Sequence, residues 1–199
     1  MPKKYAAIIL AAGSSSRLGK PKQLIEFKGN TLLQQAIDTA KAAVTGPVIV
    51  VTGANREKLL NATAGSGSLI ISNEDWEEGI ASSIRKGIEA LEQSDNKVDG
   101  AIVMVCDQPY CDETVLRNLI AEQQRTGKAA VASAYGGSMG TPVLFEKQFF
   151  NDLKKLSGDS GAKKLLKAHP DRVATVEFEN GDVDIDTPED LQKLQSTWP

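Results

Sequence analysis

Short apolar runs without polar alternation are the feature that most constrains the fold of this 199-residue chain. Such runs are typical of strands buried on both faces, because a strand with one face in water alternates instead. Segments with helical spacing of apolar residues separate them, as at 31–43 and 80–91. The expected strands span residues 6–11, 47–51, 68–72, 101–105 and 129–134. The pattern predicts an α/β fold with three layers, in which helices cover both faces of a mostly parallel central sheet.

The pattern changes after Tyr135. The elements expected beyond it are a glycine-rich loop leading into a short strand (136–145), helices within 145–156 and 157–169, two short strands around a turn (174–186) and a final helix (188–194). Thr187 is expected to cap the final helix, with Pro188 in the first helical position. No linker, low-complexity tract or repeat interrupts the sequence. Residues 1–199 are therefore predicted to form one domain, with the later segment closing over the edge of the sheet.

Composition excludes several classes of function. The formal net charge of −3 argues against the cationic surface that binding to a nucleic acid backbone requires. No segment approaches the ~18 apolar residues of a membrane-spanning helix. Two cysteines and a single histidine, His169, argue against a Cys/His zinc site and fit a reducing compartment. We therefore expect a cytoplasmic protein with neither a nucleic acid nor a membrane as partner, and we assign His169 no catalytic role.

The loop LAAGSSSRLGKPKQ at residues 10–23 follows the first expected strand and has the composition of an anion-binding loop. Its small residues let the backbone approach a ligand, and its amides and serine hydroxyls can cradle phosphate oxygens. Arg17 and Lys22 add positive charge suited to a polyphosphate. Parallel sheets bind ligands at the carboxyl ends of their strands, which is where this loop lies. That position favours an anion site over a solvated connection with incidental charges.

Two familiar phosphate-binding motifs do not fit this loop. A Walker A motif has four residues between its glycines and a hydroxyl residue after its lysine. Here five residues separate Gly13 from Gly19, and Pro21 follows Lys20. A dinucleotide fingerprint requires an acidic residue at the end of the second strand, but that strand ends at Gly53 without one. The loop therefore needs a different explanation.

The loop contains Leu10-Ala11-Ala12-Gly13, Arg17-Leu18-Gly19 and Lys22. This combination resembles the signature of the molybdenum cofactor nucleotidyltransferases, and within them the cytidylyltransferase branch. The resemblance covers nearly the whole chain and implies a Rossmann-like fold of the nucleotide-diphospho-sugar transferase type. It also implies an enzyme that joins the NMP part of a nucleoside triphosphate to a phosphate-bearing acceptor and releases pyrophosphate. The implied substrates are CTP and Mo-molybdopterin, the implied cofactor is Mg²⁺, and the implied partner is a molybdoenzyme that receives the product.

Acidic residues at two further places complete the site that the resemblance implies. Asp107 follows the fourth expected strand and corresponds to the family's metal-binding aspartate. Asp184 and Asp186 share one face of an expected strand, and the resemblance implies that one of them completes the Mg²⁺ site. The sequence leaves open which one. The alternatives are that Asp107 caps a turn before Pro109 and that Asp186 belongs to the start of the final helix.

The resemblance assigns roles to particular residues. The residues expected to be catalytic are Arg17, Lys22 and Asp107, and those expected to bind the metal are Asp107, Asp184 and Asp186. The residues expected to bind the nucleotide are Leu10, Ala11, Ala12, Gly13, Ser14, Ser15, Lys22, Asn73 and Ser82. The residues expected to lie on the side of the acceptor are Gly140, Pro142, Asp159 and Gly161. The family often carries arginine where this chain has Lys163, so bidentate recognition is not expected there. Without the resemblance, Asn73 and Ser82 would be taken as structural and Asp159 as a helix cap.

Two other functions stay open. One is a nucleotidyltransferase that acts on a sugar phosphate or methylerythritol phosphate. The other is a non-catalytic chaperone that delivers the pterin cofactor to a molybdoenzyme. A chaperone could lose the charges that bind a triphosphate, so the presence of Arg17, Lys22 and Asp107 favours an enzyme. CTP is preferred to GTP because the guanylyl branch tends to have Leu-Ala-Gly-Gly at the first site.

Overall fold

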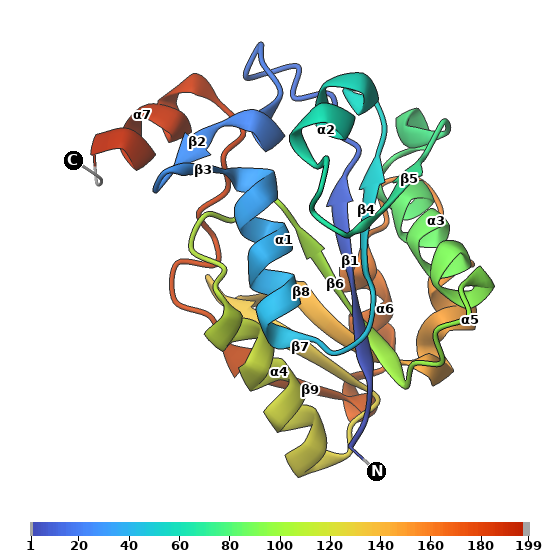
Figure 1. Cartoon of the computed structure of the whole chain (residues 1–199). Helices are drawn as coiled ribbons and strands as arrows, with labels where there is room; N and C mark the ends of the chain where they lie inside the picture. Colours follow the sequence, from blue (N-terminus) through green and yellow to red (C-terminus); the bar gives the residue numbers. More distant parts are fainter. Residues whose placement is uncertain (1, 197–199) are drawn as a thin grey trace.

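A twisted seven-stranded sheet forms the centre of the computed structural model, which describes residues 2–196 (Figure 1). Its strands lie in the order β5-β4-β1-β6-β8-β7-β9. Their bounds are β1 Tyr5–Ala11, β4 Val48–Thr52, β5 Leu69–Ser72, β6 Gly100–Val105, β7 Ala130–Tyr135, β8 Ser138–Glu146 and β9 Val173–Glu177. All neighbouring pairs are parallel except those made by β8, which runs antiparallel to both β6 and β7. The predicted α/β fold with a mostly parallel sheet is confirmed.

Helices cover both faces of the sheet and give the three layers (Figure 1). Strand β1 is buried along its whole length, and its side chains alternate between two cores. Ala7 and Ile9 pack with α1 and α4, whereas Ala6 and Ile8 pack with α3, α5 and α6. The helices are α1 Leu32–Ala43, α2 Arg56–Ala62, α3 Ile80–Gln93, α4 Glu113–Thr126, α5 Phe150–Leu153, α6 Ala162–Ala168 and α7 Pro188–Ser196. An apolar run without alternation is thus explained by burial on both sides.

Local sequence explains where several helices begin. The Asp112 carboxylate accepts a hydrogen bond from the Val115 amide at 3.0 Å and caps α4. Thr31 caps α1 in the same way. At α7, the Thr187 hydroxyl accepts from the Asp190 amide while the Asp190 carboxylate accepts from the Thr187 amide. This reciprocal pair with Pro188 in the first position is a strong helix start.

Three predictions about the later part of the chain differ from the structure. Strand β8 has nine residues and lies inside the sheet, so this segment does not simply close over an edge. Its hairpin with β7 turns at Gly136–Gly137, where both glycines have positive φ. The expected second strand of the segment 174–186 is also absent from the described residues: β9 ends at Glu177, and 183–186 has no regular secondary structure. The helix expected within 145–156 is reduced to the short α5 and the 3₁₀ turn before it.

A third, smaller apolar cluster joins the two ends of the chain. Helix α7 contributes Leu191 to it, the anion loop contributes Leu18, and the segment after the loop contributes Ile25. The two-residue strands β2 (Glu26–Phe27) and β3 (Asn30–Thr31), which pair with each other, lie beside it. Ile185, completely buried in this cluster, fixes the segment that carries the C-terminal aspartates. We refer to these residues together as the terminal cluster.

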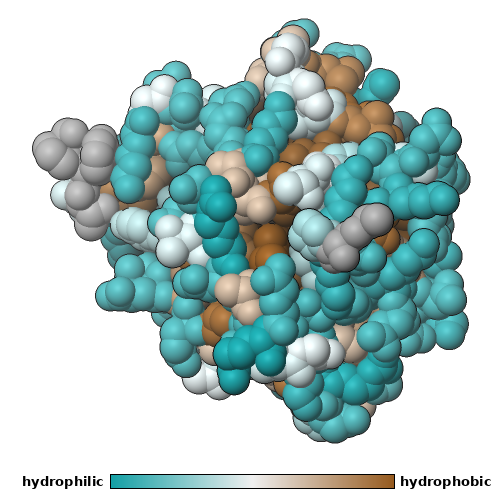
Figure 2. Space-filling view, turned by 60° about the horizontal axis from the view of Figure 1, so that its bottom comes forward, coloured by the Kyte–Doolittle hydropathy of each residue, from teal (hydrophilic) through white to brown (hydrophobic). Residues whose placement is uncertain are grey.

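The face drawn in Figure 2 is largely hydrophilic, with hydrophobic residues reaching the surface in a central band and at the upper edge. Within residues 2–196, no helix has the length and apolarity needed to cross a membrane.

Candidate functional site

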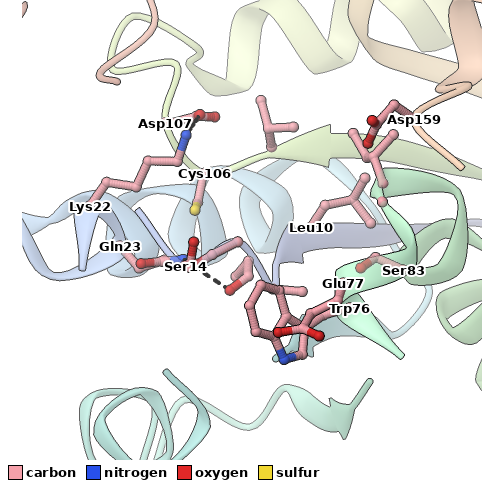
Figure 3. Close-up of a pocket in the computed structure, with 16 residues that line it drawn as sticks. Leu10, Ser14, Lys22, Gln23, Trp76, Glu77, Ser83, Cys106, Asp107 and Asp159 are labelled. Atoms are coloured by element: carbon pink, nitrogen blue, oxygen red, sulfur yellow. Dashed lines mark hydrogen bonds and ion pairs between the residues drawn. The ribbon is translucent and has the colours of Figure 1, made fainter. Parts of the chain in front are cut away.

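A cleft of about 370 Å³ opens at the carboxyl ends of β1 and β6. Its floor includes Leu10 at the end of β1 and Val105 at the end of β6, and the start of α3 forms one wall. Lys22 and Asp107 lie at one end of the cleft, and Ser83 and Asp159 lie at the other (Figure 3). The cleft therefore has a charged end and an end with mostly apolar walls.

The anion loop is held in shape by Gln23, a residue with no distinguishing pattern in the sequence. Its side chain is 1% exposed, and its amide nitrogen donates to the carbonyl oxygens of Ala11 and Gly13, both at 3.0 Å. The Ser15 hydroxyl accepts from the Lys22 amide at 3.0 Å. Because these contacts engage the carbonyls, the small residues of the loop are left lining the cleft with little side chain in the way. A buried amide in a loop has no periodic signal, so only the fold reveals it.

Lys22 brings together residues that are far apart in sequence. Its ammonium contacts the Asp107 carboxylate and donates to Oδ1 of Asp186 at 2.7 Å. Arg17 donates to the other oxygen of Asp186 at 2.8 Å. Of these side chains Lys22 is 18% exposed, Asp107 13%, Asp186 36% and Arg17 70%. The Lys22–Asp107 pair is thus the partly dehydrated centre of the cluster, where charge interactions are strongest.

The electrostatics of the cluster follow from this geometry. Burial alone would lower the pKa of Lys22, but the Asp107 and Asp186 carboxylates outweigh it and raise the pKa above its ordinary value. The hydrogen bond from Lys22, with Arg17 adding its charge, lowers the pKa of Asp186. Partial burial and the charge of Asp107 raise the pKa of Asp184 to about 6, although the residue as a whole is exposed. Lys22 and Asp186 are therefore fully charged at neutral pH.

Asp184 and Asp186 are placed near Lys22 and Asp107 by contacts other than those of the predicted strand. The Ile185 amide donates to the Asp107 carbonyl oxygen at 3.1 Å, which fastens this segment to the end of β6. Since 183–186 is not part of the sheet, strand alternation does not explain the placement of the two aspartates. Asp186 contacts Lys22, whereas Asp184 acts on the cluster through its charge.

The acidic residues fit a divalent cation of the Mg²⁺ type. Within the described part of the chain, no group of three or more His, Cys, Asp or Glu side chains is arranged as a ready-made metal cage. Mg²⁺, however, is usually held by one or two carboxylates and completed by substrate phosphates and water. Asp107 and Asp186 provide such a pair, because both contact the same ammonium group.

The residues expected to bind the nucleotide divide into two groups. Those lining the cleft are Leu10, Ala11, Ala12, Gly13, Ser14 and Lys22. Asn73 is completely buried and donates its amide protons to Ser82 at 2.8 Å and Ser83 at 3.0 Å. Ser82 is 1% exposed and donates to the Gly79 carbonyl oxygen. Asn73 and Ser82 thus stabilise the turn into α3, and Ser83 is the serine that lines the cleft.

The residues expected on the acceptor side also lie in two places. Asp159 lines the cleft, next to Gly79. Gly161 precedes α6. Gly140 and Pro142 lie in β8 and do not line the cleft; they are near the hydrogen-bonded side chains of Gln108, Tyr135 and Thr141. Gln108 directly follows Asp107, so this part of β8 lies beyond the charged end of the cleft.

A glycine- and serine-rich loop at the carboxyl edge of a parallel sheet, facing a lysine-bridged pair of carboxylates, defines a nucleotide-binding α/β protein. Comparison of the sequence with known families makes the class more specific. The chain belongs to the family of the MobA-like NTP transferase domain, which it matches over residues 7–173.

Curated relatives of similar length carry different names. The chain is 29% identical to the nicotine blue oxidoreductase of Paenarthrobacter nicotinovorans and 28% identical to the purine catabolism protein PucB of Bacillus subtilis, each over 94% of both chains. It is 25% identical to the molybdenum cofactor cytidylyltransferase of Escherichia coli over 92% of both chains.

A solved structure agrees closely with the fold. Rv0371c of Mycobacterium tuberculosis superimposes with a TM-score of 0.82 at 27% identity, covering 98% of this chain and all of that one. The same protein has been solved in complex with manganese, and that structure superimposes with a TM-score of 0.78. The predicted family is thereby confirmed.

Proposed function

We propose that this protein transfers the nucleotidyl part of CTP to a phosphate-bearing pterin acceptor, Mo-molybdopterin, and releases pyrophosphate. The observation that carries the proposal is the cluster of Lys22, Arg17, Asp107 and Asp186 beside the anion loop. It combines fixed positive charge for a triphosphate with a carboxylate pair for a divalent cation. Nucleotidyl transfer needs both, because two anions must approach each other.

The chemistry requires no nucleophile from the protein. An oxygen of the acceptor phosphate attacks the α-phosphorus in line, a new P–O bond forms, and the bond to the leaving pyrophosphate breaks. Lys22 and Arg17 neutralise charge on the triphosphate and on the leaving group. Asp107 and Asp186 would hold Mg²⁺, which supplies further charge neutralisation on the phosphate oxygens. The loop from Ala11 to Ser14 positions the phosphates through its backbone.

The choice of CTP and of the acceptor rests on family likeness. The E. coli relative is named for a molybdenum cofactor cytidylyl transfer, and the Leu10-Ala11-Ala12-Gly13 sequence resembles that branch. A molybdoenzyme that takes up the product is the expected partner. The free cysteines, Cys106 and Cys111, suit the reducing cytoplasm in which we expect the protein to act.

A direct test is to incubate the protein with Mg²⁺ and molybdenum-loaded molybdopterin, add each nucleoside triphosphate in turn, and measure pyrophosphate. Release with CTP supports the proposal. Release with GTP alone overturns the choice of nucleotide. Release only when a sugar phosphate or methylerythritol phosphate replaces the pterin would identify a different transferase.

If no combination of nucleoside triphosphate and acceptor releases pyrophosphate, the non-catalytic chaperone is favoured. In that case, activation of an apo-molybdoenzyme by the pterin-loaded protein is the positive test. One relative is named an oxidoreductase, so an assay for a redox reaction belongs in the same series. A redox reaction without nucleotidyl transfer would overturn the proposal.

Substitution of the central ion pair tests the assigned roles. Lys22→Ala and Asp107→Ala are each expected to lower turnover by about 10²–10³-fold, the usual effect of removing one group that stabilises transition-state charge. Lys20→Ala is the matched control, because Lys20 belongs to the same loop, is exposed, and does not line the cleft. Circular dichroism and melting temperature establish that the variants are folded. Wild-type turnover in either variant would contradict these roles.

A further inference from the structure

The end of the cleft opposite Lys22 has the properties of a nucleobase site. Leu10 and Trp76 lie at this end (Figure 3), and Ile80, which also lines the cleft, begins α3 one turn before Ser83. Ile80 is 36% exposed and is one of three large hydrophobic residues classed as exposed in the described part of the chain. An apolar side chain left open inside a cleft favours a flat, weakly hydrated ligand.

Two carboxylates, Glu77 and Asp159, line the cleft on this side (Figure 3). Asp159 is exposed, and its side chain makes no hydrogen bond or ion pair with any other described residue. Backbone hydrogen bonds hold its segment in place. The Ala81 amide donates to the Gly158 carbonyl oxygen at 3.2 Å, and the Gly161 amide donates to the Asp159 carbonyl oxygen at 2.9 Å.

The neighbouring backbone is shaped to make room for this carboxylate. A Cβ atom at Gly79 would lie 2.5 Å from Asp159 Oδ1, and Gly79 has a φ of 102°, which other residues rarely adopt. Ser83 lies one turn along α3 from Ile80 and lines the same end. Asp159 and Ser83 therefore lie together at the apolar end (Figure 3).

From this arrangement we infer that Asp159 determines base specificity by accepting a hydrogen bond from the exocyclic amino group of the bound nucleobase. This inference rests on the proposed nucleotide-binding function. An ionised carboxylate can only accept hydrogen bonds. Cytosine presents an amino group at the position where uracil presents a carbonyl oxygen, so the carboxylate attracts the first and repels the second.

The nucleotide, rather than the acceptor, is the ligand that this end fits. Leu10 and Ala11 belong to the strand end that runs directly into the anion loop, so a base lying on them is continuous with phosphates held at Gly13 and Lys22. The acceptor then enters from the other side of Lys22, where the segment 183–186 lies against Asp107.

Calorimetric titration of the Mg²⁺-containing protein with CTP and with UTP, in the absence of acceptor, tests the inference. The wild type is expected to bind CTP about tenfold more tightly than UTP, an effect within the range of one charged hydrogen bond. Asp159→Asn keeps the shape but adds an amide that can donate to the uracil oxygen, so the preference should fall to about threefold or less. Asp159→Ala should lose the preference in the same way.

Asp75→Asn is the matched control, because Asp75 is exposed on the segment before α3 and does not line the cleft. This variant also removes one negative charge, and it should keep the wild-type ratio of CTP affinity to UTP affinity. Equal affinities in the wild type, or an unchanged ratio in both Asp159 variants, would overturn the inference while leaving the transferase proposal intact. If no triphosphate binds to the wild type and no pyrophosphate is released, the proposed function itself fails.

Discussion

Lys22 does for the two carboxylates what a metal ion does in many nucleotide sites: it holds negative groups together. Its ammonium contacts both Asp107 and Asp186, and it is largely buried between them. A divalent cation that binds this pair must therefore compete with an internal positive charge. The triphosphate offers Lys22 a new partner, so we expect the cation and the nucleotide to bind together rather than separately.

This competition predicts the effect of removing the charge while keeping the length of the side chain. Lys22→Met should bind Mn²⁺, in the absence of nucleotide, on the order of tenfold more tightly than the wild type. Electron paramagnetic resonance of free Mn²⁺ measures this directly, without any activity assay. Lys20→Met should resemble the wild type, and weaker Mn²⁺ binding by the Lys22 variant would show that the lysine does not compete with the cation.

At the scale of secondary-structure elements, α7 links the C-terminal aspartates to the anion loop. Leu191 of α7 packs in the terminal cluster with Leu18 and Ile25, which flank the 3₁₀ turn carrying Lys22. Ile185 belongs to the same cluster and lies between the two aspartates. Packing of this helix therefore positions charged groups that it does not itself contain.

Loosening the cluster should accordingly weaken triphosphate binding. Leu191→Ala is expected to cost about 2–3 kcal/mol of unfolding free energy, the lower part of the range for a buried leucine because the cluster is small. It should also weaken affinity for the triphosphate several-fold, measured by calorimetry. Leu119→Ala on α4, completely buried away from the cleft, should destabilise the protein without changing that affinity. Equal affinity losses in the two variants would indicate a general effect of instability.

The elements differ in how far the sequence could predict them. The strands at 5–11, 48–52 and 100–105 were predictable, because burial on both faces leaves continuous apolar runs. The segment 183–186 was not, since one backbone hydrogen bond to Asp107 and the burial of Ile185 place it. Gln23 was missed for a similar reason, because its partners are backbone carbonyls that any sequence would offer. The charges of the site could be predicted, but the contacts that position them could not.

At the scale of the whole molecule, buried weak acids make the free energy of unfolding depend on pH in the alkaline range. Burial, with some help from Asp107, raises the pKa of Cys106 to about 12, and burial raises the pKa of Cys111 to about 12. Burial and a hydrogen bond with Glu146 also raise the pKa of Tyr5. Each group stays neutral in the folded protein but ionises in the unfolded chain. The contribution of each group to the free energy of unfolding is therefore complete below the pKa that the group has in the unfolded chain. It declines as the pH rises above that value.

The free energy of unfolding should thus fall between pH 9 and pH 11. For a fully buried thiol such as Cys106, the loss at pH 10 is on the order of 1–2 kcal/mol. Urea denaturation under reducing conditions at several pH values measures the slope. Cys111→Ala should flatten it, whereas a pH-independent stability in this range would show that the thiols are ionised in the folded protein.

The pairing of Lys22 with Asp186 also has a consequence for biosynthesis. The two residues are 164 positions apart, so a ribosome working at 5–20 residues per second needs roughly 10–30 s to make the second after the first. During that interval the emerging chain carries a cationic loop whose acidic partner does not yet exist. The site is completed only after the segment 183–186 and the helix that anchors it have left the exit tunnel, so nascent chains cannot use the triphosphates that surround them.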